Sequence, residues 1–472
     1  VPGCATTSGR PTSSESSPTV RESTRRDRSE TVSQAEDIPR SDRSEPKRGD
    51  DPAADTSVEE PQPEADRIAS TAPGSPASIP ERPPDRIDET IERMIASMTI
   101  EQKVGQLLMP AYLYNGDGEP VRTVTPDLRR LIRDTQPGGF LLFGANIHNP
   151  PQVRKFVQTM QNVIDVPLLV AVDQEGGVVR RLVPSETMPV TNVPAAARVG
   201  RLQDPELAFQ LGRLVARELR SLGITVNLAP VADVLTNPQN AVIGSRSYGR
   251  SVEVVESMVE ATVRGLQSEN VSAAIKHFPG HGDTMEDTHN ELARVNHDLT
   301  RLEEVELRPF RRGIEAGTDA ILIGHISVPS VSGDMVPATL NYALSEGLLR
   351  DRLGYDGLIV TDALTMAALT RYYDPEEIPV RAVVAGADIL LRPGDPRIAS
   401  ERIVTAVREG VISIERIEAS VRRILEVKFR RGLIASPDRY IDAEPREWAP
   451  VRELPEGIVE TPKAKTKRDT VN

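Results

Sequence analysis

Residues 272–289 read SAAIKHFPGHGDTMEDTH, an apolar run that passes into a loop rich in titratable side chains. The first seven residues, SAAIKHF, are typical of a buried strand, because apolar residues occupy both alternating sets of positions. The whole stretch holds three of the six histidines of the chain, namely His277, His281 and His289. A strand that ends in such a loop indicates a functional site at its C-terminal end.

Six further apolar runs have the length of strands: GGFLLFG (138–144), PLLVAVDQ (167–174), VNLAPVADV (226–234), DAILIGH (319–325), GLIVTDA (357–363) and ADILLRP (387–393). Helical patterns lie between them, for example at residues 205–223 and 251–269, and a long helical region covers 395–433. Apolar strands that alternate with helices indicate a parallel sheet covered by helices. Seven or eight such units in about 340 residues favour a closed (β/α)8 TIM-type barrel that forms a single catalytic domain.

Polar residues stand at the C-terminal ends of five of these predicted strands. They are Asp173, Asp233, His277, His325 and Asp362. A single polar residue after a strand can simply cap the next helix. Five in phase favour an active site instead, because barrels carry their active sites at this end of the strands.

The composition narrows the function further. The 472 residues include 57 Lys and Arg against 70 Asp and Glu, a net charge of −13, which argues against a nucleic-acid partner. Aromatic residues make up only 3%, which favours a small pocket over a long stacking groove. One cysteine, Cys4, excludes an internal disulfide, and no apolar run is long enough to predict a membrane-spanning helix.

Three regions differ in composition along the chain. Residues 1–84 are rich in Ser, Thr, Pro and charged residues, so we expect a disordered tether. Residues 85–434 would form the barrel, and residues 435–472 a polar tail. The opening VPGC resembles the end of a bacterial lipoprotein signal, which implies a lipid anchor at Cys4 and an extracytoplasmic or periplasmic location. A stray cysteine and a cytoplasmic location stay open as alternatives.

The loop after residue 278 admits more than one chemistry. A metal site would use His277, His281 and His289, but their spacing matches neither the HExxH pattern nor a cysteine-based zinc site, so we expect no metal. The pair Asp287 and His289 suits proton transfer instead, because a carboxylate two residues away can fix the tautomer of an imidazole and stabilise its protonated form. A solvated loop pair is the remaining alternative.

KHFPGHGDT, followed by the Asp-x-His pair, resembles the β-N-acetylglucosaminidase branch of the family 3 glycoside hydrolases. The likeness extends over most of residues 95–433. It includes MTIEQKVGQLLM, VDQEGGVVRRL, NLAPVADV with IGSRSYG, LGYDGLIVTDALTM and AGADILLRP, in the family's order.

The resemblance implies a role for each matching residue. Asp362 would be the nucleophile that forms a covalent glycosyl-enzyme. His289 would be the acid/base, supported by Asp287. The substrate-binding residues would be Asp173, Arg181, Arg246, Lys276 and His277, whereas His281 would shape the loop. Salt bridges and helix caps are the alternative roles for these residues.

The implied activity is that of a retaining exo-β-N-acetylhexosaminidase without a cofactor, acting as a monomer on a small carbohydrate from peptidoglycan or chitin. The chain departs from the family pattern at Val178, where Arg is frequent, at Ala363, where Asp is frequent, and at Thr288, which replaces a frequent Ser. A β-glucosidase, a phosphorylase of the same family and a silent sugar-binding lipoprotein are therefore alternatives. The intact set of Asp362, Asp287 and His289 argues against the silent binder.

Overall fold

The computed structural model describes residues 84–288 and 291–434. The described residues all belong to one compact unit. The predicted disordered tether up to residue 83, Cys4, the tail 435–472 and His289 lie outside the described residues.

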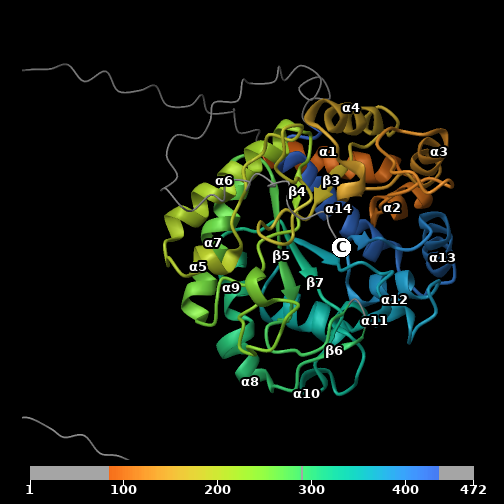
Figure 1. Ribbon diagram of the computed structural model, residues 1–472. Coiled ribbons are helices and arrows are strands. Elements are labelled where there is room, and N and C mark those ends of the chain that lie inside the picture. The colour runs from red at the N-terminus through yellow and green to blue at the C-terminus, as the bar shows by residue number, and fades with distance from the viewer. Residues whose placement is uncertain (1–83, 289–290, 435–472) are drawn as a thin grey trace, which may run out of the picture. The chain divides into compact units, whose positions relative to one another are not determined.

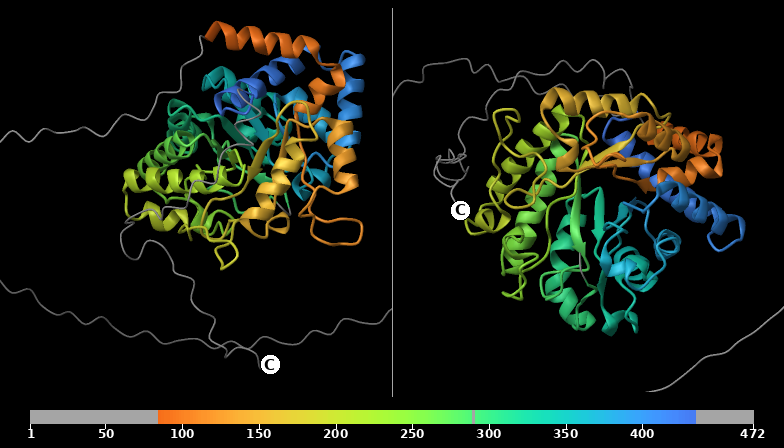
Figure 2. Two further views of the ribbon diagram at one scale, coloured as in Figure 1. Left: turned by 90° about the horizontal axis from the view of Figure 1, so that it is seen from above. Right: turned by 45° about the vertical axis from the view of Figure 1, so that its right-hand side comes forward.

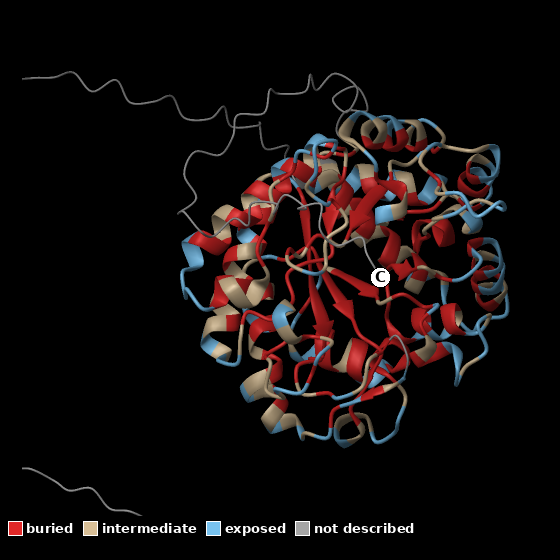
Figure 3. Ribbon diagram, in the orientation of Figure 1, coloured by how far each residue is buried: buried red, intermediate tan, exposed pale blue. Residues whose placement is uncertain are grey.

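Six strands form a parallel sheet in the order β2, β3, β4, β5, β7, β9. Their bounds are β2 (Gly139–Leu142), β3 (Leu169–Val172), β4 (Val226–Asn227), β5 (Ser272–Phe278), β7 (Ala320–Ile323) and β9 (Leu358–Thr361). Every residue of these strands is buried, as expected for a parallel sheet with covered faces. In Figure 3 the buried residues accordingly fill the centre of the molecule.

Two shorter parallel pairs accompany the sheet. β1 (Leu108–Met109) pairs with β10 (Leu390–Leu391), and β6 (Ala293–Arg294) pairs with β8 (Ile326–Ser327). β10 also lies beside β9, because Ile389, the residue before β10, forms a parallel bridge with Val360. On the other side, the Leu141 N–H of β2 donates to the Pro110 carbonyl, 2.9 Å away, directly after β1.

Helices surround the strands. Figure 1 shows α6 and α7 along one side of the strands and α12 and α13 along the other. The α-helices are α1 (Pro84–Ser97), α2 (Ile100–Gln106), α3 (Pro126–Thr135), α4 (Pro150–Gln161), α5 (Ala196–Gly200), α6 (Pro205–Ser221), α7 (Val252–Ser268), α8 (Leu299–Arg301), α9 (Arg308–Glu315), α10 (Pro329–Ser332), α11 (Ala367–Thr370), α12 (Ile378–Ala385), α13 (Pro396–Arg408) and α14 (Ile414–Arg430). Short 3₁₀ segments are η1 (Gly144–Asn146), η2 (Gly244–Arg246) and η4 (Ala338–Leu340), and π-helical segments are η3 (Leu302–Glu306) and η5 (Ala343–Arg352).

Local sequence explains where several helices begin. Thr99 and Gln102 form a reciprocal capping box at the start of α2, with N···O distances of 3.3 and 2.9 Å. α3, α4, α6 and α13 each begin with Pro after a polar cap residue whose side chain accepts a backbone N–H. None of the described helices is both long and apolar enough to cross a membrane.

The two ends of the described chain meet. Figure 2 shows α1 beside α14, and an ion pair joins Glu92 to Arg422. α14 also contributes Arg423, which lies 3.3 Å from the buried Asp388 just before β10. These contacts hold the first and last helices to the same core.

The predicted strands and helices are largely confirmed, but the short strands β1, β6 and β8 and the break in the last helical region differ from the prediction. MTIEQKVGQLLM contains α2 and then β1, and the sequence prediction missed this strand because it is only two residues long and follows the helix directly. The long helical region 395–433 is two helices, α13 and α14. They are separated at Gly410, whose φ of 75° favours glycine and ends the first helix.

Candidate active site

The C-terminal ends of β3, β5 and β9 carry the central residues of the site. Asp173 follows β3 directly, Asp362 follows β9 directly, and Lys276 and His277 lie in β5. In a regular strand, consecutive side chains point to opposite faces. The pairing of β5 with β7 shifts register between Ile275 and Phe278, and both Lys276 and His277 contact residues of the site. The sheet irregularity therefore lets neighbouring residues serve one site.

Lys276 is the centre of a buried ion cluster. Its Nζ lies 2.9 Å from Asp173 Oδ1 and 2.6 Å from Glu175 Oε1, and its side chain is 3% exposed. Arg181 donates to Asp173 Oδ2 at 3.1 Å, and Arg246 forms two 2.8 Å hydrogen bonds with Glu175. Three cations thus face these two carboxylates, and Asp233 lies near Arg246 as a further acidic group.

Burial and charge act in opposite directions on these carboxyl groups. Burial raises the pKa of Asp173, but Lys276 and Arg181 outweigh it and hold that pKa at about 2. The pKa of Glu175 is likewise lowered, because Lys276 and Arg246 overcome its burial. Both groups are therefore anionic at neutral pH. Asp173 is the more accessible, with 16% of its side chain exposed against 4% for Glu175, so Asp173 is the better placed to accept hydrogen bonds from a ligand.

His277 is held in one tautomer by two partners. Its Nδ1 lies 2.7 Å from Asp233 Oδ2, and its Nε2 lies 3.3 Å from an Arg246 nitrogen. A guanidinium only donates, so Nε2 accepts and Nδ1 carries the proton that is donated to Asp233. The pKa of Asp233 is lowered, because His277 and the His281 backbone N–H outweigh the effect of its burial.

Asp362 lies partly buried among imidazoles and one lysine. Burial would raise its pKa, but His325, His277, the Ala363 N–H and Lys276 together lower it. The Ala363 N–H donates to Asp362 Oδ1 at 2.7 Å, and His325 Nε2 donates to the Ala363 carbonyl at 3.0 Å. Asp362 is thus ionised, which a nucleophilic carboxylate requires.

A third arginine, Arg392, lies beside the site near Asp362. Arg392 follows β10 and stacks on the Phe143 ring at 5.3 Å, and Arg181 lies 5.2 Å from the same ring. Burial lowers the pKa of Arg392, and Asp362 partly offsets this effect. Arg392 therefore adds positive charge near Asp362.

The loop after β5 carries Asp287, which is described and partly buried, and His289, which lies outside the described residues. His281 is 2% exposed, and its backbone N–H donates to Asp233 Oδ1 at 2.6 Å. Its Nδ1 lies 2.5 Å from Thr284 Oγ1, and burial and the nearby His277 lower its pKa to about 4. These contacts fit a residue that shapes the loop. Within residues 84–288 and 291–434, no three His, Cys, Asp or Glu side chains gather in an arrangement that could bind a metal.

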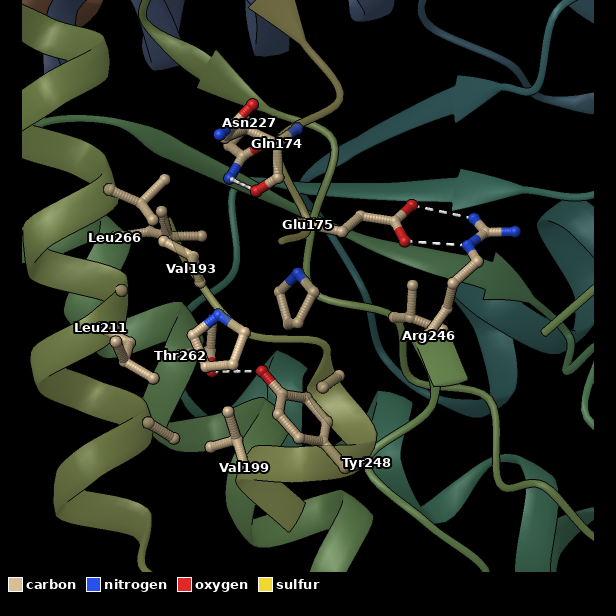
Figure 4. A pocket seen from close by; sticks show the side chains of 18 residues that line it. Gln174, Glu175, Val193, Val199, Leu211, Asn227, Arg246, Tyr248, Thr262 and Leu266 are labelled. Atoms are coloured by element: carbon tan, nitrogen blue, oxygen red, sulfur yellow. Dashed lines mark hydrogen bonds and ion pairs between the residues drawn. The ribbon is translucent and has the colours of Figure 1, made fainter. Parts of the chain in front are cut away.

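A small cavity lies behind the ion cluster. Figure 4 shows Glu175 and Arg246 on one side of it and the hydrogen-bonded pair Tyr248 and Thr262 on another. The cavity holds about 40 Å³, well below the roughly 300–1,000 Å³ of a ligand pocket. Its walls are mainly apolar residues of α6, α7 and the loop before α5. It is therefore a packing space behind the site rather than a ligand pocket.

Four residues of the site received no specific function in the sequence prediction. Glu175 was visible within the DQEGG motif, and Asp233 and His325 were recognised as strand-end residues without an assigned partner. Arg392 had a signal too, because it directly follows the late strand ADILLRP. Their roles depend on contacts between strands far apart in the sequence, which spacing alone does not give.

Residues 99–427 match the glycosyl hydrolase family 3 N-terminal domain, and the chain belongs to this family. The chain is 32% identical over 365 residues to beta-hexosaminidase A of Pseudoalteromonas piscicida, a match that covers 70% of this chain and 61% of that protein. It is 35% identical over 289 residues to a beta-hexosaminidase of Nitrosomonas eutropha, covering 60% and 81%.

Among solved structures, the fold resembles a glycoside hydrolase family 3 beta-N-acetylglucosaminidase from Paenibacillus sp. str. FPU-7. The TM-score is 0.68 and the identity is 41%, over 76% of this chain and 65% of that one. The chain thus spans about two thirds or less of the length of these two relatives, the Pseudoalteromonas protein and the Paenibacillus structure.

Proposed function

We propose that this chain is a retaining exo-β-N-acetylhexosaminidase that removes terminal β-linked N-acetylglucosamine from peptidoglycan or chitin fragments. The observation that carries the proposal is the ionised Asp362 at the end of β9, beside the buried ion cluster around Asp173 and Lys276. A sugar bound to Asp173 at the end of β3 would present its anomeric carbon to the end of β9, where Asp362 lies. The beta-hexosaminidase names of the relatives support the choice of sugar.

The proposed reaction proceeds by two displacements. In the first, an Asp362 oxygen bonds to the anomeric carbon, the glycosidic bond breaks, and His289 gives its proton to the leaving oxygen. In the second, His289 takes a proton from water, the water oxygen bonds to the anomeric carbon, and Asp362 departs as a carboxylate. Asp287 would orient His289 and stabilise its protonated form. No cofactor is required.

The substrate-binding residues would divide into two groups. Asp173 and Arg181, with 16% and 28% of their side chains exposed, would contact the sugar directly. Lys276, Arg246 and His277 are 3%, 13% and 9% exposed, so they would act mainly by fixing Asp173, Glu175 and the shape of the pocket. Arg392 would add attraction for an electron-rich substituent of the sugar.

We further propose that the sheet closes into an eight-stranded (β/α)8 barrel, as the sequence predicts. Support comes from the parallel pairing of β1 with β10, the bridge from Ile389 to Val360, and the hydrogen bond from Leu141 to Pro110. These contacts would link β9 through β10 and β1 back to β2. Residues 85–434 would be the single catalytic domain of the chain.

Location and partners are proposals on sequence grounds. A lipid anchor at Cys4 with residues 1–84 as a tether would place the enzyme outside the cytoplasm, and we expect a monomer that binds neither nucleic acid nor metal. A precursor with Cys4→Ala should then leave the membrane fraction in which the unchanged precursor is found. Equal fractionation of the two would refute the anchor.

The experiment that tests the activity compares p-nitrophenyl N-acetyl-β-glucosaminide with the matching β-glucoside, with and without inorganic phosphate. A hexosaminidase releases nitrophenol from the first substrate only and needs no phosphate. Preference for the glucoside indicates the β-glucosidase. Dependence on phosphate indicates the phosphorylase, because a neutral imidazole base at His289 would not repel the anionic phosphate acceptor. No turnover of either substrate indicates the silent binder.

A further inference from the structure

The loop after β5, here called the acid/base loop, has the described residues 279–288 and 291–292. Its first half is packed tightly on the loop after β4. The Asn240 amide donates to the His281 carbonyl at 2.7 Å, and the Asn237 N–H donates to the Gly282 carbonyl at 3.2 Å. A Cβ atom added to Gly282 would lie 1.8 Å from the Val234 carbonyl oxygen, so only glycine allows this approach. The loop therefore starts from a fixed position.

Beyond Thr284 the surroundings change. A polar cleft of about 420 Å³ opens here, and Met285, which lines it, is 70% exposed. Its other lining residues are Thr236, Asn237, Pro238, Asp283, Glu286, Arg294 and Asn296. Asp287 follows two residues after Met285. The segment that leads to the proposed acid/base dyad thus runs along open space on this side.

One side-chain bridge spans the base of the loop at this point. Asp283 Oδ2 lies 2.7 Å from His297 Nε2, and Asp283 Oδ1 accepts a hydrogen bond from Thr236 Oγ1 at 2.8 Å. His297 lies three residues after β6, whose pairing with β8 returns the chain to the body of the protein. The His297 carbonyl in turn accepts a hydrogen bond from Ser330 Oγ. The bridge therefore ties the outgoing end of the loop to its returning end, 14 residues later.

We propose that His297 is a positioning residue for the acid/base loop, acting through Asp283. The inference rests on the proposed function, because it assigns the proton transfer to Asp287 and His289. Three residues separate Asp283 from Asp287, so the position of Asp283 helps to fix where the loop carries the dyad. Misplacing a catalytic group by about 1 Å can lower a rate about 10²-fold. The bridge touches neither Asp362 nor the Asp173 cluster, so ground-state sugar binding does not depend on it.

The test uses the full chain with three variants: His297→Ala, His297→Gln and, as a control, His148→Ala. The Gln amide can still donate to Asp283, and His148 is an exposed histidine on another loop. The kinetic constants kcat and KM are measured with N,N′-diacetylchitobiose, a poor leaving group, and with the nitrophenyl substrate, a good one. For His297→Ala we expect kcat to fall about 10- to 100-fold on the disaccharide and less than about threefold on the nitrophenyl substrate.

KM should stay within about twofold, and His297→Gln should recover most of the lost rate. Deuterium exchange of backbone amides in the acid/base loop should accelerate in His297→Ala and stay unchanged in His148→Ala. Equal losses on both substrates, a loss confined to KM, or unchanged loop exchange would overturn the proposal. If the unchanged enzyme hydrolyses neither substrate, the proposed function is wrong, whereas the exchange result still decides whether His297 holds the loop.

Discussion

Replacing Lys276 with Met removes the charge at the centre of the ion cluster and leaves Asp173 and Glu175 buried without it. Breaking a buried charge pair typically costs about 3–5 kcal/mol, because the remaining partner is left uncompensated. The structure gives a consistent figure: the lowered pKa of Asp173, about 2 instead of 3.8, corresponds to about 2 kcal/mol of stability at neutral pH. A second carboxylate, Glu175, adds to this loss.

The sign of the pH dependence follows from the same groups. In the unchanged protein, the low pKa of Asp173 contributes stability above pH 3.8 that is lost as the pH falls towards 2. Without Lys276, burial is the strongest influence and favours the protonated carboxyl groups. The destabilisation should therefore be largest near pH 7.5 and smaller near pH 4.5, where both groups can take up protons.

Urea unfolding of Lys276→Met at these two pH values measures the effect, with the exposed Lys155→Met on α4 as the matched control. We expect a loss of about 3–5 kcal/mol near pH 7.5 for Lys276→Met and less than about 0.5 kcal/mol for the control. A loss below about 1 kcal/mol, or one that is equal at both pH values, would refute the charge argument.

Further predictions concern the acid/base, a buried lysine and metals. His289→Ala should lower turnover of the disaccharide by about 10²–10⁴-fold but spare much of the nitrophenyl rate, whereas equal losses would point to a binding role. Lys428 is fully buried, its Nζ donates to Gln106 Oε1 at 2.7 Å, and burial lowers its pKa to about 7. The protein therefore loses stability as the pH falls from 10.5 towards 7, because the unfolded chain takes up a proton at Lys428 that the folded protein does not. Lys428→Met should raise the melting temperature at pH 7 and flatten the dependence of stability on pH. An unchanged slope of stability against pH would contradict this prediction. EDTA should not change the rate, and a loss restored by metal would revive a site at His277, His281 and His289.

Much of the fold could be predicted from the sequence, because each parallel strand is an apolar run between helical patterns. β5 begins and ends where SAAIKHF does. β1 could not be predicted in this way, because its two residues follow α2 directly and acquire strand geometry only by pairing with β10, about 280 residues later. β6 and β8 were missed because each has only two residues and acquires strand geometry only by pairing with the other.

The site was partly predictable, since strand-end polarity singled out Asp173 and Asp362 in phase. The resemblance to the family supplied their expected roles. Salt bridges were the alternative role for Lys276 and Arg246, but the sequence did not name Glu175 as their partner or show how far the two are buried, because this depends on how Glu175 approaches them across strands. His297 gave no signal at all, because its contact with Asp283 arises from the path of the loop rather than from any motif.

The central claim is that Asp362 forms the covalent glycosyl-enzyme. A fluorinated N-acetylglucosamine analogue that transfers its sugar rapidly but is hydrolysed slowly should trap this intermediate, and peptide mass spectrometry identifies the labelled residue. We predict one sugar per chain on the peptide that contains Asp362, and no label on Asp362→Asn. A label on another residue, or hydrolysis at an undiminished rate by Asp362→Asn, would contradict the account.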